Sequence, residues 1–324
     1  FLFNNNMLTG SIPPELGNLT NMQMFYLYQN LLTGPIPAEL GYLSNVQQFF
    51  LYRNMLTGSI PAQLCNMTKM QHFYILDNMM TGTIPPEMGQ MVDMRFIYAD
   101  KNLFTGPIPS ELGSLTRMQF LYLNRNMLTG PIPPELGAIQ YMAYLYLDNN
   151  MLSGTIPPGL GNLVQFVDLF LYENMLTGIV PSEFGQLDKL QYLYLDANML
   201  SGSMPSSMGG LESVQFFYVR ENMMTGPIPS TLGALGAVKE LFFFDNLFDH
   251  SLPVELNKLT SLQILRLQHN LLTGSLEGVF NINMTLLENV DLSDNKFSGK
   301  IPTNIFELPD VNSVALSINS LDGS

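Results

Sequence analysis

The chain has few of the residues that form disulfide bonds or commonly act in catalysis. Its 324 residues include one cysteine, Cys65, and three histidines, His72, His250 and His269. A lone cysteine forms no disulfide within the chain, so cysteine usage does not identify the compartment. The histidines lie too far apart along the repeats described below to share a metal ion. No Ser-His-Asp or Cys-His arrangement can be assembled, so the sequence predicts no enzyme, no metal site and no cofactor.

Positive charge and long apolar runs are also scarce. The 13 Lys and Arg are outnumbered by 27 Asp and Glu, which gives a net charge of −14. No basic stripe is present to neutralise phosphates, which argues against a nucleic-acid partner. No stretch approaches the roughly 18 apolar residues that a membrane helix requires. The sequence therefore predicts no membrane-spanning segment.

Asparagine, by contrast, recurs at a fixed interval along the whole chain. The interval is 24 residues, with a single step of 25 before Asn295. The series comprises Asn6, Asn30, Asn54, Asn78, Asn102, Asn126, Asn150, Asn174, Asn198, Asn222, Asn246, Asn270, Asn295 and Asn319. This period, with the pattern L-x-x-L-x-L-x-x-N-x-L, is typical of a leucine-rich repeat solenoid. We expect each Asn to bridge the backbones of adjacent coils at a tight bend, which would give a buried amide ladder.

The second half of the repeat indicates a particular subclass of leucine-rich repeat. One unit runs from Met118 to Gly137 and ends in L-T-G-P-I-P-P-E-L-G. This tail resembles that of plant-type leucine-rich repeats, which are found in receptor-kinase ectodomains, polygalacturonase-inhibiting proteins and algal surface proteins. The resemblance covers essentially the whole chain, and it implies a binding module outside the cytosol. The paired-cysteine caps of that subclass and any kinase segment are absent here.

The repeat predicts an α/β solenoid, a curved right-handed coil with about 14 parallel inner strands. Each coil should hold a short strand, a bend at Asn, a Thr-Gly turn, an Ile-Pro segment and a brief 3-10 or helical turn outside. Positions Asn−8, Asn−5, Asn−3 and Asn+2 are apolar almost everywhere and should face the core. Glu recurs after Pro at the start of the helical turn, as in Glu111 and Glu135, where a carboxylate suits the helix dipole.

The repeats are not uniform along the chain. Residues 1–245 are regular and rich in Met and Tyr, whereas 246–324 diverge. The coil after Asn270 loses Ile-Pro and carries the extra residue, and a local change of twist is expected there. We interpret 246–324 as a C-terminal subregion of the same solenoid. No terminal cap is visible, so we interpret the chain as a fragment of a longer protein.

Alternation in a strand places Asn−6, Asn−4 and Asn−2 on the concave face, opposite the core. Aromatic residues dominate this face, although these positions are usually polar and variable. The Asn−4 column holds Tyr26, Phe50, Tyr74, Tyr98, Tyr122, Tyr146, Phe170, Tyr194, Tyr218 and Phe242 in succession, and it breaks at Arg266, Asp291 and Ala315. A contiguous exposed apolar area of this size normally marks a binding site.

Two interpretations of the aromatic face remain open at this point. The rings could contact a partner, since Tyr gives a large contact area at low entropic cost. They could instead stack on one another and strengthen cohesion between coils without any partner. A second apolar column, Met or Leu at Asn+1, has the same ambiguity. It could form an adaptable contact line at the rim or belong to the core.

The sequence therefore predicts a protein-binding module that docks its partner on the aromatic concave face. In one version of this hypothesis the chain is a component of a larger assembly. Tyr98, Tyr122 and Tyr146 are the expected anchors. The full set of predicted contact residues is Tyr74, Tyr98, Phe120, Tyr122, Tyr144, Tyr146, Phe170, Tyr192, Tyr194 and Tyr218. The alternatives are a surface that binds glycans or cell-wall polysaccharide, and a structural surface-coat protein. Few polar groups beside the rings could fix sugar hydroxyls, which disfavours the glycan.

Three N-x-S/T sequons fall on the same outer part of their coils. They begin at Asn18, Asn66 and Asn283. Glycans at these positions would leave the concave face free. Together with the plant-type resemblance, the sequons favour a glycoprotein that is secreted or displayed at the cell surface.

Overall fold

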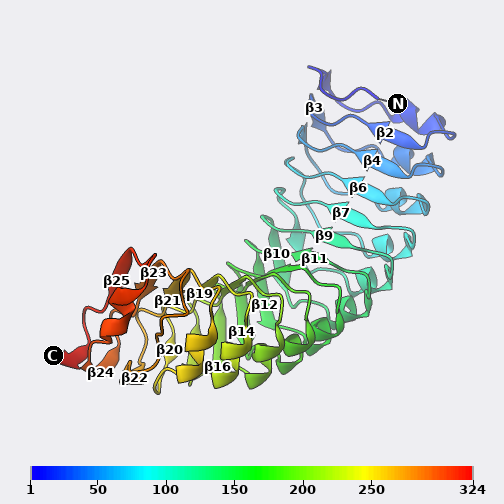
Figure 1. The fold of residues 1–324 in the computed structure, drawn as a ribbon. Helices are drawn as coiled ribbons and strands as arrows, with labels where there is room; N and C mark the ends of the chain where they lie inside the picture. Colours follow the sequence, from blue (N-terminus) through cyan, green and yellow to red (C-terminus); the bar gives the residue numbers. More distant parts are fainter. Residues whose placement is uncertain (1, 323–324) are drawn as a thin grey trace. The chain divides into compact units, whose positions relative to one another are not determined.

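The structure, a computed structural model, describes residues 2–322. The chain forms two compact units, unit 1 (Phe1–Gly159) and unit 2 (Leu160–Ser324). Each unit stacks coils built from an inner strand, a bend, a lateral segment and a 3-10 helix, and Figure 1 shows the inner strands of each unit following one another in chain order. We keep the name concave face for the solvent-facing side of the inner strands.

Unit 1 contains six inner strands that pair in parallel. They are β2 (Met24–Tyr26), β4 (Gln48–Phe50), β6 (His72–Tyr74), β7 (Phe96–Tyr98), β9 (Phe120–Tyr122) and β11 (Tyr144–Tyr146). The lateral strands are β1 (Thr9–Gly10), β3 (Leu31–Gly34), β5 (Met55–Leu56), β8 (Thr105–Gly106), β10 (Met127–Gly130) and β12 (Met151–Thr155). The 3-10 helices are η1 (Pro14–Asn18), η2 (Ala38–Tyr42), η3 (Ala62–Asn66), η4 (Pro86–Gln90), η5 (Ser110–Ser114) and η6 (Pro134–Ala138), and η7 (Pro158–Asn162) includes the boundary between the units.

Unit 2 repeats this plan with seven inner strands. They are β13 (Asp168–Phe170), β15 (Tyr192–Tyr194), β17 (Phe216–Tyr218), β19 (Glu240–Phe242), β21 (Ile264–Arg266), β23 (Asn289–Asp291) and β25 (Ser313–Ala315). The lateral strands are β14 (Met175–Gly178), β16 (Met199–Ser203), β18 (Met223–Gly226), β20 (Leu247–Phe248), β22 (Thr273–Gly274), β24 (Lys296–Lys300) and β26 (Ser320–Asp322). The 3-10 helices are η8 (Ser182–Gln186), η9 (Ser206–Gly210), η10 (Ser230–Ala234), η11 (Val254–Lys258) and η12 (Thr303–Glu307).

The predicted solenoid of parallel inner strands with short outer 3-10 turns is confirmed. The described residues hold six inner strands in unit 1 and seven in unit 2, against about 14 expected. In the first coil the strand is reduced to a single bridge between Leu2 and Tyr26. Within unit 1, neighbouring inner strands pair residues 24 apart, for example Tyr98 with Tyr122, so equivalent side chains lie side by side.

The asparagine ladder holds neighbouring coils together, as the sequence predicts. The Asn102 amide donates to the carbonyl of Ile75 in the preceding coil at 3.0 Å, and to Ala99 and Asp100 in its own coil at 3.3 and 3.2 Å. Its oxygen accepts the Met80 N–H at 3.0 Å. One buried side chain thus satisfies backbone groups of two coils at a bend, where no strand ladder could do so.

The bend itself has a constant backbone geometry. The residue before each Asn adopts a left-handed conformation in all 14 coils, with φ between 48 and 56°. Lys101 and Ala197 are examples, with φ of 52 and 48°. Non-glycine residues adopt this region at a cost in free energy. We attribute its persistence to the Asn side chain, which hydrogen-bonds the carbonyls around the bend.

The core lies between the inner strands and the outer turns, at the positions predicted. In one coil Met118, Leu121 and Leu128 are 0% exposed and Leu123 is 1% exposed. On the outer side the 3-10 helices pack closely through glycine. A Cβ added at Gly113 would lie 2.5 Å from the backbone oxygen of Glu135 in the next coil. Glycine is therefore required there by the spacing of the coils.

The expected Thr-Gly turn is only partly correct. The segment after Asn forms short parallel strands in most coils, and these strands pair into lateral sheets beside the inner strands; β10 pairs with β12 and β16 with β18. Gly130 keeps a positive φ of 76°, and the chain turns there after the strand. Sequence reasoning missed these sheets because the strands are too short for their alternation to stand out from turn residues.

The irregular coil after Asn270 differs in structure from its neighbours. Among the described residues it has no 3-10 helix between η11 and η12. Asn257 stands where the regular coils have glycine, and its amide donates to the Gly278 carbonyl at 2.9 Å. Asn281 in turn donates to the Asn257 carbonyl at 2.9 Å. Side-chain amides here replace the close glycine contact of the regular coils.

Replacing one ladder asparagine tests its part in stability. In Asn102→Ala the bonds to Met80 and Ile75 are lost and buried backbone groups are left unpaired, so we expect the free energy of unfolding to fall by about 3 kcal/mol. Urea denaturation followed by circular dichroism measures the loss. The exposed Asn18→Ala is the control and should change stability by less than about 0.5 kcal/mol. Equal effects of the two substitutions would contradict a structural ladder.

Candidate binding face

The Asn−4 side chains of unit 1 form a row of parallel, stacked rings on the concave face. Ring centroids are 4.3 Å apart for Tyr74 and Tyr98, 4.5 Å for Tyr98 and Tyr122, and 4.1 Å for Tyr122 and Tyr146. The interplanar angles are 11, 10 and 6°. The in-register strands impose this geometry, since the ring spacing is close to the spacing of strands. We call these four residues the tyrosine row.

A second line of rings flanks the tyrosine row at the Asn−6 positions. Phe120 stacks on Tyr144 with centroids 4.4 Å apart, and its edge meets Tyr98 and Tyr122 at 6.2 and 6.1 Å. Such edge contacts are a favourable arrangement of aromatic rings. The two lines therefore form one continuous aromatic layer over β7, β9 and β11 of unit 1.

Unit 2 carries a comparable layer over β13 to β19. Phe170, Tyr194 and Tyr218 follow one another with centroids 4.6 and 4.5 Å apart. Tyr192 stacks on Phe216 at 4.9 Å and meets Tyr194 edge-on at 6.2 Å. All ten predicted contact residues thus lie on the solvent side of inner strands, six in unit 1 and four in unit 2.

Each of these ten rings is half-buried. Their faces are covered by neighbouring rings, while part of each ring remains in contact with solvent. Stacking is therefore present, as one of the two interpretations of the sequence requires. Stacking and partner contact do not exclude each other, because a partner would meet the exposed edges of a layer whose rings are already fixed.

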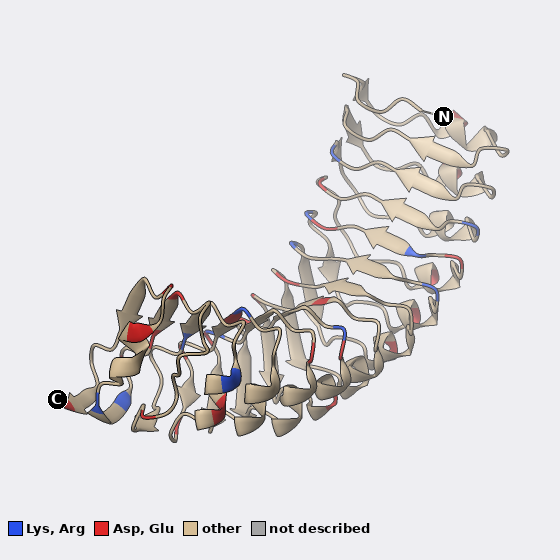
Figure 2. Ribbon diagram, in the orientation of Figure 1, with Lys and Arg blue, Asp and Glu red and all other residues tan. Residues whose placement is uncertain are grey.

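Charge distinguishes the two units. The inner strands of unit 1 contain no Lys, Arg, Asp or Glu, whereas those of unit 2 contain Asp168, Glu240, Arg266 and Asp291. Figure 2 shows the charged residues of unit 1 in the segments between the inner strands. A partner on the unit 1 face would therefore meet apolar ring edges and phenol groups, with charges only at the margins.

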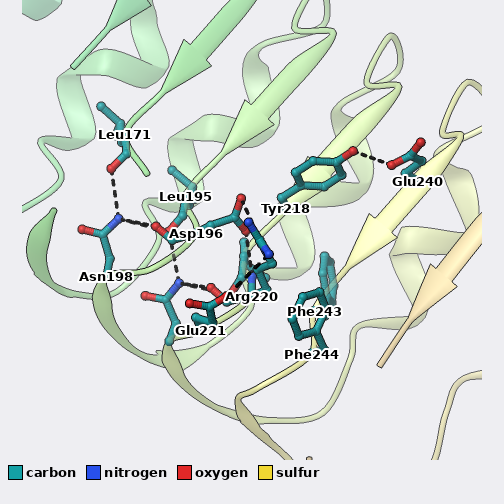
Figure 3. Close-up of polar contacts among 12 residues, drawn as sticks. Leu171, Leu195, Asp196, Asn198, Tyr218, Arg220, Glu221, Glu240, Phe243 and Phe244 are labelled. Atoms are coloured by element: carbon teal, nitrogen blue, oxygen red, sulfur yellow. Dashed lines mark hydrogen bonds and ion pairs between the residues drawn. The ribbon is translucent and has the colours of Figure 1, made fainter. Parts of the chain in front are cut away.

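Unit 2 has a polar network at the end of its strands (Figure 3). The Asp196 carboxylate accepts the backbone N–H of Arg220 at 3.0 Å and lies 3.8 Å from the guanidinium Nε. Arg220 also pairs with Glu221 at 3.5 Å, and its Cζ lies 5.4 Å from the centre of the Phe244 ring. This arrangement fixes a cation over an aromatic ring beside the concave face.

Burial shifts the pKa of several groups on this face. It raises the pKa of Asp196 to about 7, against a lowering by Arg220, and the pKa of Asp100 to about 6. The pKa of Tyr218 is also raised by burial and by its hydrogen bond to Glu240, to which its hydroxyl donates. The Tyr218 phenol is therefore neutral at physiological pH.

The Asn+1 column lies at the surface, so the core interpretation of this column is wrong. Met55, Met127 and Met151 are 39, 40 and 41% exposed. Each lies at or near the start of a lateral strand, where the alternation that buries Asn+2 turns Asn+1 outward. These thioethers form an exposed apolar rim, as in Met7, Met55, Met79, Met127 and Met151 of unit 1 and Met175, Met199 and Met223 of unit 2.

The remaining candidate residues lie apart from the aromatic layer. Asn18 and Asn66 are the last residues of η1 and η3, Asn283 lies in the irregular coil, and all three are exposed. Cys65 is buried in η3, and burial raises the pKa of its thiol to about 12. Residues 2–322 contain no cluster of three or more His, Cys, Asp or Glu that could hold a metal ion. Every helix in this range is a 3-10 helix of five residues, too short to span a membrane.

Comparisons with known proteins agree with this geometry. A leucine-rich repeat family profile matches residues 140–200, and a second one matches 117–139 and 286–308. No curated protein sequence matches the chain. The chain is therefore a leucine-rich repeat protein on the evidence of its fold and of these profiles.

The chain is similar in fold and sequence to solved structures of plant receptors. The PEPR1–AtPEP1 complex is 30% identical with a TM-score of 0.80, covering 98% of this chain and 51% of that one. The Arabidopsis receptor kinase HAESA, in complex with the peptide hormone IDA and the co-receptor SERK1, is 26% identical with a TM-score of 0.81, covering 99% of this chain and 62% of that one. A plant ice-binding protein is 28% identical with a TM-score of 0.60, and the match covers 71% of this chain and 74% of that one.

The chain spans between half and two thirds of the length of the two receptor structures. Its repeats are similar to plant receptor-kinase ectodomains, as the L-T-G-x-I-P tail predicts. The leucine-rich repeat fold is a binding scaffold rather than an enzyme, which agrees with the lack of a catalytic constellation in the sequence.

Asp196 makes the stability of unit 2 depend on pH. Its pKa rises from 3.8 to about 7 on folding, so the folded chain keeps a proton that the unfolded chain releases. The resulting stabilisation is complete below about pH 4 and is lost as the pH rises through 7. Relative to Asp196→Asn, the wild type should lose on the order of 3 kcal/mol of unfolding free energy between about pH 4 and pH 8. Urea denaturation at the two pH values measures this, and parallel pH profiles of the two proteins would contradict it.

Proposed function

We propose that this chain is the ligand-binding part of an extracellular or cell-surface protein, which docks a protein or peptide partner on its aromatic concave face. The observation that carries the proposal is the uncharged, half-exposed aromatic layer of unit 1. Exposed apolar area of such extent marks interaction sites. The peptide complexes of the similar receptors support a polypeptide partner and an extracellular location.

The dimensions of the tyrosine row suit an extended peptide. Four strands about 4.8 Å apart span about 14 Å between the first ring and the last. An extended chain advances about 3.3 Å per residue, so four or five residues would cross the row. Apolar or aromatic side chains of that segment would lie between the ring edges, and its backbone groups would meet the phenol hydroxyls. Lys101 and Asp77, which follow β7 and β6, are exposed and offer both signs of charge at the margin.

A polypeptide fits this face better than the alternatives. A polysaccharide would need several polar groups beside the rings, and the inner strands of unit 1 contribute mainly aliphatic and aromatic side chains. None of the similar structures named above is described as a glycan complex. We therefore propose a polypeptide as the partner. In one version of the proposal the chain is part of a larger assembly, in which the partner covers the face permanently.

Truncating the anchors tests the proposal. A pull-down from native extract would compare the wild type with Tyr98→Ala, Tyr122→Ala, Tyr146→Ala, both checked for folding by circular dichroism. Loss of a single anchor should cost on the order of 2 kcal/mol, or about 30-fold in Kd, and the triple variant should lose the partner.

Two controls separate contact from scaffold. Tyr42→Ala with Tyr141→Ala removes exposed tyrosines that lie in outer turns, at 66 and 64% exposure, and should leave binding unchanged. Replacing the three anchors with Phe keeps the stacked rings and should retain most of the affinity. If the triple Ala variant retains the same protein as the wild type, the aromatic face is not the docking site.

We also propose that Asn18, Asn66 and Asn283 carry N-linked glycans. Their exposure on outer turns supports this, because glycans there would leave the concave face accessible. After expression in a secretory eukaryotic host, each Asn→Gln substitution should remove one glycan, seen as a stepwise mass decrease. Asn162 is the matched control, since it is the exposed last residue of η7 but precedes Leu163-Val164 and forms no sequon. A single mass for all variants would contradict the assignment.

A further inference from the structure

The tyrosines of the concave face occur in stacked pairs, and this pattern has chemical consequences beyond binding. The tyrosine row contains three successive pairs, Tyr74–Tyr98, Tyr98–Tyr122 and Tyr122–Tyr146. Two further pairs stack in the same way, Tyr28 on Tyr52 at 4.4 Å and 8°, and Tyr194 on Tyr218 at 4.5 Å and 4°. Elsewhere a tyrosine stacks on phenylalanine, as Tyr26 does on Phe50.

Stacking of this kind aligns equivalent atoms. The strands run parallel and in register, so the two phenols of a pair have the same orientation and are displaced by one coil. The ortho carbons of one ring therefore face the ortho carbons of the next, across the ring separation of 4.1 to 4.5 Å. A phenol that loses an electron and a proton becomes a phenoxyl radical, whose unpaired electron is shared with the ortho carbons.

We propose that the stacked tyrosine pairs are sites of oxidative cross-linking, where a haem peroxidase with hydrogen peroxide joins neighbouring coils through dityrosine. Each of the two phenols gives up one electron and one proton, and the peroxide takes up both pairs and becomes two waters. The two radicals form a carbon–carbon bond between ortho carbons. Each ortho carbon then releases its proton, and the phenol oxygens take up these two protons, so the protein loses two hydrogens for each link.

The surroundings of the pairs favour this reaction. The rings are half-buried, so their exposed edges are open to an oxidant while the stacked neighbour stays within reach. No competing thiol is accessible, because the only cysteine, Cys65, is buried. Raised pKa values keep Tyr74 and Tyr194 neutral, so electron and proton leave together. Each link would tie residues 24 positions apart and so restrain the unfolded chain.

The structure also specifies which tyrosines form no internal link. Tyr42 and Tyr141 are the most exposed tyrosines and lie in outer turns, so they would couple only between molecules. Tyr144 stacks on Phe120, and Tyr192 stacks on Phe216 and meets Tyr194 only edge-on, without aligned ortho carbons. A phenylalanine partner forms no dityrosine. This pattern provides the matched controls.

The experiment treats dilute protein with a haem peroxidase and hydrogen peroxide, in a Tyr42→Phe, Tyr141→Phe background that suppresses links between molecules. Dityrosine fluorescence and the loss of two hydrogens per link are measured, and peptides are mapped by mass spectrometry. The expected links join Tyr74 with Tyr98, Tyr122 with Tyr146, and the members of the two separate pairs.

Two substitutions that preserve the stack should halve the signal. The row of four forms at most two links and the separate pairs one each, four in all. Tyr98→Phe with Tyr146→Phe leaves no adjacent tyrosines in the row, so the maximum falls to two. Tyr144→Phe with Tyr192→Phe removes the same number of phenols and should leave the fluorescence unchanged. Absence of internal dityrosine, or equal losses in the two double variants, would overturn the proposal.

Discussion

The amide of the repeated asparagine is the interaction on which the rest of the structure depends. It holds a left-handed bend in its own coil and bonds the backbone of the coil before it, so it fixes both the shape of one coil and its register with the next. With Asn102 as the example, four backbone groups from two coils meet one buried side chain. Because the register is fixed in this way, equivalent side chains of neighbouring coils lie one strand spacing apart.

The aromatic layer follows from that register. A ring at Asn−4 in one coil must lie over the ring at Asn−4 in the next. A Tyr repeated at this position therefore forms a stack of rings. The same spacing leaves ring edges exposed, since only the faces are covered. The proposed binding and the proposed cross-linking therefore depend on the same geometry. Unit 1 keeps charges out of its inner strands, whereas unit 2 places Glu240 and Arg266 within them, so the two units offer chemically different faces.

Much of this could be predicted from the sequence, because a repeat reports the same physical constraint many times. The period gave the solenoid, the apolar positions gave the core, and alternation placed Tyr98 and Tyr122 on the concave face. The lateral sheets were missed because strands of two to five residues, most of which contain Thr-Gly or Ser-Gly, look like turns. The position of the Asn+1 methionines stayed ambiguous for the same reason: without those sheets, nothing indicates which way Met127 points. Whether a ring is covered by another molecule is not encoded in the repeat at all.

The most direct test of the account is hydroxyl-radical footprinting of the chain alone and with its captured partner, read by mass spectrometry. We predict that the partner protects Tyr98, Tyr122 and Tyr146 from labelling and leaves the exposed Met55, Met127 and Met151 as reactive as before. Protection of the methionine rim or of the outer turns, with the concave rings still fully labelled, would contradict the claim that the aromatic layer is the docking face.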